Sequence, residues 1–272
     1  MHFGATLRLL RLESGLGLRD LARRLNVSGA YLSRVENGLD SIPTSARVEA
    51  IAGALQIPAP LLHELAHRVS PLVVDYVDAV PEAGSLLLEI ADRRLSAAEL
   101  AELRDFLNQR FPSKQAARRQ AGATSISELL TPATVILRFS GSSIDDVIDV
   151  AVGRLERETA QNRYVIASDL KQREREASSA IGGGVAVLCA NTLDDTPAAV
   201  VVTLQKALAY DTPDQQELRL IVVLAGPRNS PERRIGLARV ARLAARGLCN
   251  DLADVASPDL VIEHLARLEL FG

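Results

Sequence analysis

A cysteine that follows a run of glycines is the feature of this sequence that could most directly do chemistry. Residues 181–191 read IGGGVAVLCAN, so that Gly182, Gly183 and Gly184 run into a strand-like VAVL and then into Cys189. A thiolate is a nucleophile and can be oxidised, whereas a buried, protonated cysteine behaves as a small apolar side chain. Which of the two describes Cys189 depends on the elements that position it.

The composition indicates a packed globular chain without extracellular features. Of the 272 residues, 47% are hydrophobic and 24% are charged, which supports a core and argues against wholesale disorder. No apolar run approaches the roughly 20 residues of a membrane span, and the opening MHFGATLRLLRLESG has no signal-peptide core. The two cysteines form no CxxC pair, so no disulfide framework is expected. We therefore predict a cytoplasmic, bacterial-type protein with no cofactor and no metal.

The charged residues favour a local binding patch over a global field. Residues 1–121 carry a net charge of +1, and the remainder carries −4. Any nucleic-acid binding must then come from a local cluster of basic groups. Nearly all of these groups are Arg, which suits bidentate contacts to phosphate and guanine. His63 and His67 lie one helical turn apart, but no Cys or acidic cluster accompanies them, so both are expected to face solvent.

Short helical patterns alternate with turn residues in the first seventy positions. Five apolar-periodic segments are separated by glycines, prolines and the turn at 26–28. Ser28 is the expected N-cap of the third helix, and Gly38 follows the end of that helix. The spacing predicts a compact all-α unit over residues 1–69, with a helix, a tight turn and a second helix near its middle.

These segments carry a family resemblance. Residues 3–65 resemble the phage-repressor-like (XRE, Cro/C1-type) helix-turn-helix DNA-binding family through LRLLR, LRDLARRLNVSGAYLSRVENG and IPTSARVEAIAGALQI. The resemblance implies that the helix beginning at Ser28 lies in the major groove. It also implies that Glu36 is structural and pairs with Arg8 or Arg11. The residues expected to contact DNA are Arg19, Ser28, Gly29, Ala30, Tyr31, Ser33, Arg34 and Asn37.

Residues 70–112 read as helical throughout. Ser96 and Glu99 have the S-x-x-E spacing of a capping box, and an apolar face begins at Leu100. The segment is either a dimerisation element or an ordinary helical connector, and the sequence favours neither. The polar stretch SKQAARRQAGATS, residues 113–125, has little apolar periodicity and is predicted to be a linker.

From residue 126 onward, strands alternate with helices. Four runs read as strands: TPATVILRF, VAVLCA, AAVVVTL and LRLIVVLAG. Four helices are expected, over SIDDVIDVAVGRLERET, SDLKQREREAS, SPERRIGLARVARLAARG and SPDLVIEHLARLELF, with Ser143 and Ser230 as N-caps. The pattern predicts an α/β sandwich over residues 126–272. The fold class is therefore multi-domain: an all-α helix-turn-helix domain, a helical connector and an α/β domain.

The α/β part also carries a resemblance. It is similar to the enzyme IIA domain of the sugar phosphotransferase system, of the fructose, mannitol and nitrogen-related type, through REREASSAIGGGVAVLCAN, TVILRFSGSSIDDVIDVAVGRL and VVVTLQKALAYDTPDQQELRLIVVLAGP. In that family an Arg-Glu pair and a Gly-rich turn precede a strand ending in Pro-His, whose histidine accepts a phosphoryl group from a phosphocarrier protein. Here the Arg-Glu pair falls on Arg173 and Glu174, and Pro-His falls on Leu188 and Cys189. The phosphorylatable histidine is therefore absent.

Three roles stay open for Cys189. It is a phosphoryl acceptor, a redox or electrophile sensor whose thiolate is favoured by Arg173 and the glycine turn, or an apolar filler in a domain that has lost its chemistry. Because turn amides and a guanidinium suit an anion, Arg173, Gly183, Gly184 and Cys189 form a candidate sensor or anion site, although a tight turn alone also accounts for the glycines. Cys249, in an expected helix, is assigned to packing.

Taken together, the residues predict a sequence-specific transcription regulator. It is expected to bind double-stranded operator DNA as a homodimer, since two copies of such a domain match a palindrome. The enzyme IIA-like domain is expected to sense or to oligomerise, with no catalytic residues, no membrane, and a phosphotransferase-system protein or small effector as a further partner. The alternative is an active phosphotransferase component, phosphorylated on Cys189, with a DNA-binding head.

Overall fold

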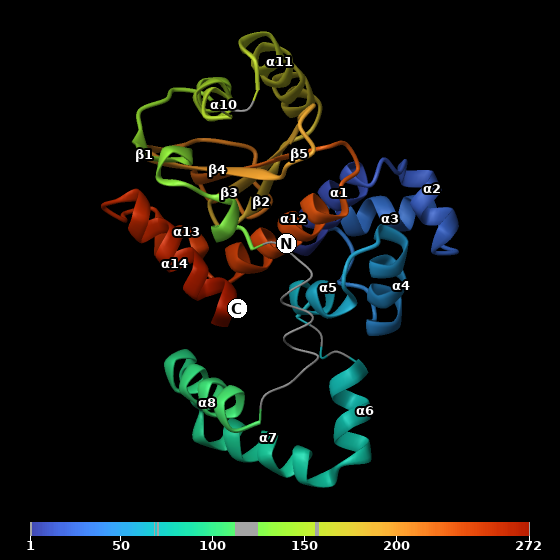
Figure 1. Ribbon diagram of the computed structural model, residues 1–272. Helices are drawn as coiled ribbons and strands as arrows, with labels where there is room; N and C mark the ends of the chain where they lie inside the picture. Colours follow the sequence, from blue (N-terminus) through green and yellow to red (C-terminus); the bar gives the residue numbers. More distant parts are fainter. Residues whose placement is uncertain (1, 68, 70, 112–124, 156–157, 272) are drawn as a thin grey trace.

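The computed structural model describes residues 2–67, 69, 71–111, 125–155 and 158–271. Figure 1 shows three parts, which we name the head (2–67), the arm (71–111) and the body (the described residues from 125 onward). The head and the arm are helical, and the body is a sheet covered by helices on both faces. The predicted multi-domain fold class is therefore confirmed. Of the predicted linker 113–125, only Ser125 lies within the described residues.

Five short helices around an apolar centre make up the head. They are α1 (His2–Glu13), α2 (Leu18–Arg24), α3 (Gly29–Glu36), α4 (Ser45–Leu55) and α5 (Ala59–Leu65). Ser28 caps α3 as predicted, because its hydroxyl accepts a hydrogen bond from the backbone N–H of Tyr31 at 3.1 Å. Gly4 lies where α1 crosses α3. A Cβ at Gly4 would collide with the carbonyl oxygen of Val35, so the crossing depends on glycine.

The arm contains three helices that bury almost nothing. They are α6 (Pro71–Ala79), α7 (Pro81–Arg93) and α8 (Ala97–Arg110). The predicted capping box is present at the start of α8, with Ser96 and Glu99 bonded reciprocally. None of the arm's described side chains is buried, and Figure 1 shows the arm set apart from the head and the body. The sequence therefore specifies these helices, but within the described part of the chain most of their large apolar side chains stay exposed.

The body is built on a mixed five-stranded sheet. Its strands are β1 (Val135–Phe139), β2 (Ala180–Gly182), β3 (Val185–Asn191), β4 (Ala198–Leu208) and β5 (Leu218–Gly226). They lie in the order β1-β4-β5-β3-β2, with β1 parallel to β4, β3 parallel to β5, and the other two pairings antiparallel. The central strands are buried on both faces, as their near-continuous apolar sequences predict.

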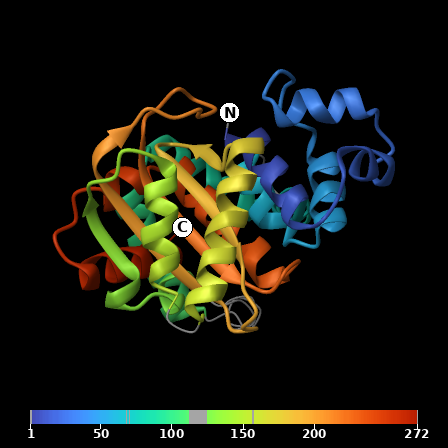
Figure 2. The same ribbon diagram turned by 90° about the horizontal axis from the view of Figure 1, so that it is seen from above.

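Helices cover the two faces of this sheet as separate layers. One face carries α10 (Ile144–Gly153) and α11 (Ala160–Glu176), and the other carries α12 (Pro231–Ala245), α13 (Leu248–Leu252) and α14 (Pro258–Phe271). Figure 2, viewed from above, shows α10 and α11 lying across the strands. Ser143 and Ser230 cap α10 and α12 through their hydroxyls, as predicted. The α/β sandwich expected for this half of the chain is confirmed.

The structure differs from the sequence-based expectation at several short elements. The helix expected from Ser143 to Thr159 ends at Gly153, and α11 begins at Ala160, eight residues before its expected start. The reason is Thr159, whose hydroxyl accepts from the backbone N–H of Asn162 and so starts a new helix. The strand β2 was not expected, because its three residues show no periodicity of their own. The helix expected around Cys249 is present as the short α13.

The head is docked on the body through α12. This helix packs against α1 and α5 of the head on one side and against the sheet on the other. The buried side chains of the head and those of the α12 face form one continuous apolar cluster, from Phe3 to Leu265. A second cluster fills the space between the sheet and the pair α10 and α11. The orientation of the head on the body is therefore set by shared core packing.

Candidate functional site

The first candidate site is the outer surface of α3. All eight residues predicted to contact DNA are exposed or half-buried, and they lie from the start of α2 to the C-terminal end of α3. Asn26 in that turn has a φ of 52°, the left-handed conformation that reverses the chain tightly. A Cβ on Gly29 would meet no atom within 4 Å, so packing does not require glycine there. The first turn of α3 thus presents small side chains over which a large partner can approach closely.

Several of the predicted residues also make contacts within the head. Ser28 uses its hydroxyl as the cap of α3, and Asn37 donates its amide to the backbone oxygen of Ser33 at 2.9 Å. Arg34 donates through Nε to Asp40 at 3.0 Å, and this contact raises the pKa of the guanidinium. The Arg34 side chain is half exposed, so its ion pair with Asp40 is weak and can be exchanged for a phosphate.

Arg47 belongs to the same surface and was not predicted. Its guanidinium lies 5.1 Å from the centre of the Tyr31 ring, a cation–π contact that joins α4 to α3. With Arg19 at the start of α2 and Arg34 on α3, it gives three exposed cations around the helix pair. Arg47 lies beyond the loop that follows the predicted recognition helix. Only the tertiary fold brings it next to Tyr31.

A buried ion pair holds α3 in place beneath this surface. Both nitrogens Nε and Nη2 of Arg11 donate to the carboxylate of Glu36, at 2.6 and 2.8 Å, and both side chains are buried. Arg11 also donates to the backbone oxygen of Leu16 at 3.0 Å. The structural role expected for Glu36 is confirmed, with Arg11 and not Arg8 as the partner. The pair links α1, α3 and the turn between α1 and α2.

The second candidate site surrounds Cys189 on β3. The thiol is buried, and burial raises its pKa well above the ordinary value, with the nearby Glu13 carboxylate adding to the effect. Arg173 on α11 donates to the backbone oxygen of Cys189. The structure therefore places Arg173 and Cys189 together, as predicted. The thiolate that the sensor role requires is disfavoured, because the effect of burial on the thiol pKa outweighs that of the nearby guanidinium groups.

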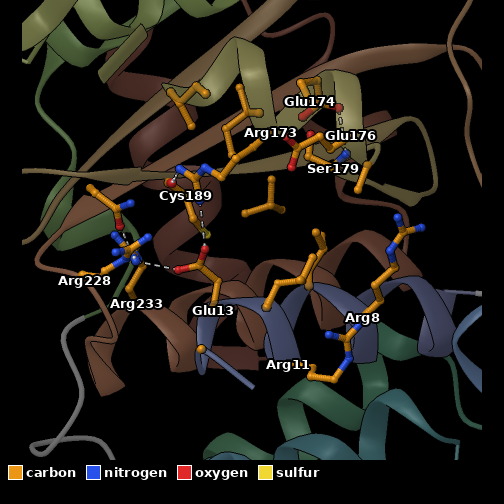
Figure 3. Close-up of a pocket in the computed structure, with 18 of the residues that line it drawn as sticks. Arg8, Arg11, Glu13, Arg173, Glu174, Glu176, Ser179, Cys189, Arg228 and Arg233 are labelled. Carbon is orange, nitrogen blue, oxygen red and sulfur yellow. Dashed lines mark hydrogen bonds and ion pairs between the residues drawn. The ribbon is translucent and has the colours of Figure 1, made fainter. Parts of the chain in front are cut away.

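A carboxylate from the head enters this site. Figure 3 shows Glu13, the last residue of α1, reaching between Arg173 of α11 and Arg233 of α12. Its Oε2 lies 2.6 Å from Nη2 of Arg233, and its Oε1 lies 3.4 Å from Nη1 of Arg173. Asp169 pairs with Arg173 from the other side, at 3.2 Å. Sequence reasoning missed both Glu13 and Arg233, because they come from elements far apart in the chain.

The glycine turn is not part of this site. Gly182, Gly183 and Gly184 have φ values of 96°, 64° and 71°, so the β2–β3 turn needs three consecutive left-handed residues. The backbone N–H of Gly183 donates to the Asp214 carboxylate at 2.6 Å. Cys189 lies four residues beyond the first residue of β3, roughly 13 Å along an extended strand. The expectation that Gly183 and Gly184 join Arg173 and Cys189 at one anion site is wrong, because the turn lies at the opposite end of β3.

The remaining singled-out residues are structural. Glu174 accepts hydrogen bonds from the backbone N–H of Ser179, at 2.8 Å, and from the hydroxyl of Tyr210, and so fixes the chain between α11 and β2. Cys249 is buried in α13 beside the glycine turn, as expected of a packing residue. His63, expected to face solvent, is instead 1% exposed in α5, a helix that packs against both α4 and α12.

A cavity of about 650 Å³ opens beside the Glu13 carboxylate. It is bounded by α1 of the head and by α11, β3 and the loop before α12 of the body. Its lining carries five arginines and three glutamates: Arg8, Arg11, Arg173, Arg228, Arg233, Glu13, Glu174 and Glu176. The described residues contain no group of three or more His, Cys, Asp or Glu that could hold a metal ion. Among these residues, no helix is long and apolar enough to cross a membrane.

The fold and the two sites define a class: a helix-turn-helix domain docked on an α/β domain with a buried arginine–carboxylate site. Comparison with known proteins supports each half. Residues 2–65 match the model of a helix-turn-helix domain. Residues 128–267, just over half of the chain, match the phosphoenolpyruvate-dependent sugar phosphotransferase system EIIA 2 family, and the chain belongs to this family. Both resemblances are therefore confirmed.

Each individual relative matches only one part of the chain. The chain is 45% identical over 56 residues to the HTH-type transcriptional repressor RghR of Bacillus subtilis (strain 168), a match that spans 21% of this chain and only 42% of the repressor. Among solved structures, nitrogen regulatory protein IIA-Ntr of Neisseria meningitidis is 23% identical, with a TM-score of 0.45 over 52% of this chain and 98% of its own. IIA mannitol of Escherichia coli is 16% identical, with a TM-score of 0.43 over 50% and 98%.

Proposed function

We propose that this protein is a sequence-specific, dimeric transcription regulator that works in the cytoplasm. In this proposal α3 reads the major groove of operator DNA, and the EIIA-like body regulates that contact without turning over a substrate. The observation that carries the proposal is the exposed first turn of α3, held rigidly by the Ser28 cap and the buried Arg11–Glu36 pair. The similarity of this half to a known transcriptional repressor supports it.

The charges around α3 suit a duplex. Arg19, Arg34 and Arg47 are exposed on α2, α3 and α4, around the small side chains in the first turn of α3. Phosphate contacts from such flanking cations position a protein on DNA, and the side chains that reach base edges provide specificity. Small residues at Gly29 and Ala30 allow the backbone to approach the bases. The body, which belongs to the part of the chain with a negative net charge, contributes no residue to this surface.

The arm supplies the surface for a second copy. It exposes ten large apolar side chains on three helices: Val73, Val74, Tyr76, Leu86, Leu87, Leu88, Leu100, Phe106, Leu107 and Phe111. Each of them is 41–68% exposed. Large apolar side chains gathered on one exposed part of a molecule mark an interaction site. An arm-to-arm homodimer would cover this surface and pair two heads, as a palindromic operator requires.

The structure around Cys189 supports a non-catalytic body. A phosphoryl acceptor must expose a nucleophile to an incoming donor, whereas Cys189 is 6% exposed and its pKa is raised by burial. Glu13 places a negative carboxylate beside the thiol, and this charge repels a phosphoryl group. The alternative function, phosphorylation on Cys189, therefore finds no support in the geometry. Of the three roles left open by the sequence, the apolar filler fits best.

The test is DNA binding by matched charge variants. Duplexes selected from a random pool by the native protein would be used in mobility-shift titrations. Arg19→Ala with Arg34→Ala should weaken binding at least tenfold, since each removes a contact to phosphate or base. The control removes the same charge elsewhere, through Arg93→Ala on the arm and Arg175→Ala on α11, both exposed. Equal affinities for the native protein and the head variant would refute the proposal.

A further inference from the structure

The cavity between the head and the body has the dimensions of a ligand site. Its volume of about 650 Å³ lies within the range of roughly 300–1,000 Å³ typical of small-molecule pockets. The head contributes Arg8 and Glu13, and the body contributes Arg173 and Arg233 (Figure 3). A molecule bound here touches both parts at once. The proposed function gives the body a sensing role and leaves this cavity without a ligand.

The cavity already contains an anion that comes from outside the body. Glu13 belongs to α1 of the head, yet its carboxylate pairs with Arg233 at 2.6 Å and with Arg173 at 3.4 Å. The Glu13 side chain is 9% exposed, so the ion pairs are largely shielded from water. The two guanidinium groups of the body thus form an anion-binding site, which the Glu13 side chain of the head occupies. A free anion that reaches the cavity competes with Glu13 for these groups.

The Glu13 carboxylate leaves some hydrogen-bond donors of this anion-binding site without an acceptor. The Nε–H groups of Arg173 and Arg233 are both buried and have no hydrogen-bond partner among the described residues. Within the cavity, Glu13 brings one negative charge and two oxygens to two guanidinium groups, while Asp169, which does not line the cavity, pairs with Arg173 alone. A phosphomonoester brings nearly two charges and three terminal oxygens, and guanidinium groups bind it bidentately. The phosphate group is therefore the better match to the donors that the site offers.

The rim of the cavity adds positive charge. Arg8 from α1 and Arg228 from the loop before α12 also line it, and neither forms an ion pair or hydrogen bond with another described residue. Both guanidinium groups are free to meet an approaching anion. Since positive groups around a concave site raise the local concentration of anions, the rim favours the same class of ligand.

We propose that a small organic phosphomonoester binds in this cavity, with its phosphate on Arg173 and Arg233, in competition with the Glu13 carboxylate of the head. The inference rests on the proposed sensing function of the body. Glu13 is the last residue of α1 and precedes the turn to α2. Ligand binding therefore changes the contact between the body and the residue that precedes the helix pair α2 and α3. By thermodynamic linkage, the affinities for DNA and for the ligand then depend on each other.

The experiment measures anion binding by the full chain in the absence of DNA. Isothermal titration calorimetry would use inorganic phosphate and glycerol 3-phosphate as probes, with glycerol as the uncharged comparison. Glu13→Gln should lower the Kd for glycerol 3-phosphate at least tenfold, because the amide no longer competes for the guanidinium groups. Glu176→Gln is the matched control: it removes a carboxylate from the same cavity that forms no ion pair with either arginine. This control should lower the Kd far less than Glu13→Gln does, because it removes a charge from the cavity wall but no competitor for the two guanidinium groups.

A loss-of-binding variant completes the test. Arg173→Gln should raise the Kd at least tenfold, whereas Arg233 is left intact because it also holds the backbone oxygens of Ala190 and Gly226. The inference is overturned if Glu13→Gln binds no tighter than the native chain, if Glu176→Gln gains equally, or if only inorganic phosphate binds. Failure here with intact DNA binding leaves the proposed regulator function standing. Phosphomonoester binding by a chain that binds no DNA would instead refute the regulator function and leave the anion site standing.

Discussion

The environment of a single residue, Cys189, decides whether the glycine–cysteine motif can do chemistry. Burial raises the pKa of its thiol well above the ordinary value, and the Glu13 carboxylate adds to that rise. We expect native Cys189 to be alkylated by iodoacetamide at pH 8.5 at least 100-fold more slowly than in the urea-unfolded chain, because the thiolate is the reactive form. Mass spectrometry of quenched samples gives both rates. Modification at the rate of a free thiol would restore the sensor role.

The same pKa shift has a consequence for stability. In the unfolded chain the thiol ionises around pH 8.5, whereas the folded thiol keeps its proton. The unfolded state therefore loses protons first as pH rises, and the free energy of unfolding falls above about pH 8.5. Below that pH the contribution is fully present. Urea denaturation of the native chain and of Cys189→Ala should show a gap that narrows as pH rises from 8 to 10.

Residue roles were predictable where both partners lie in one motif. The pairing of Glu36 with the first helix follows from the helix-turn-helix pattern, and so does the Ser28 cap. Glu13 was not predictable, because its partners Arg173 and Arg233 belong to another domain and no sequence spacing encodes the docking of two domains. The burial of His63 was also missed, because the packing of α5 against α4 and α12 depends on the tertiary fold.

Among the secondary-structure elements, the sequence predicts the long strands and the helices that begin at a capping residue. The strands β3, β4 and β5 are β-branched runs, and α10 and α12 begin at serine caps, so these elements were found. The strand β2 was missed, because its three residues end in the glycine turn and are held only by pairing with β3. The split between α10 and α11 was missed, because Thr159 capping a helix within a charged run gives no apolar signal.

The arm yields a prediction at this scale. Leu88 is 68% exposed on α7 and Phe106 is 57% exposed on α8, so more than half of each apolar side chain is uncovered. If the arms form the dimer, Leu88→Asp with Phe106→Asp should convert it to a monomer, because a charge at an apolar interface costs several kcal/mol. Sedimentation velocity gives the oligomeric state. Val165→Asp, on an exposed apolar position of α11, is the control and should stay dimeric.

A dimer that survives the arm variants would place the interface elsewhere in the molecule. The arm would then be a connector, the other role that the sequence left open. The helices themselves should persist in either case, since no described side chain of the arm is buried and the capping box of α8 lies away from the substitutions. Far-ultraviolet circular dichroism checks this point and separates loss of association from loss of helix.

At the scale of the whole molecule, the head and the body share one apolar cluster through α12. A helix-turn-helix domain on a flexible tether would unfold independently of the domain behind it. Here the core of the head, including the fully buried Leu62 of α5, continues into the core of the body. Head and body should therefore unfold as one cooperative unit, even though their sequences match two separate family models.

Calorimetry tests this coupling. Leu62→Ala removes a fully buried side chain and should destabilise by about 2–5 kcal/mol. If the core is shared, hydrogen exchange in β3 and β5 of the body accelerates together with exchange in the head, and a single heat-absorption peak moves to lower temperature. Leu103→Ala on the arm should leave that peak in place. A variant head that melts in a separate peak, with the strands of the body still protected, would show that the docking is too weak to carry a signal from the Glu13 cavity to α3.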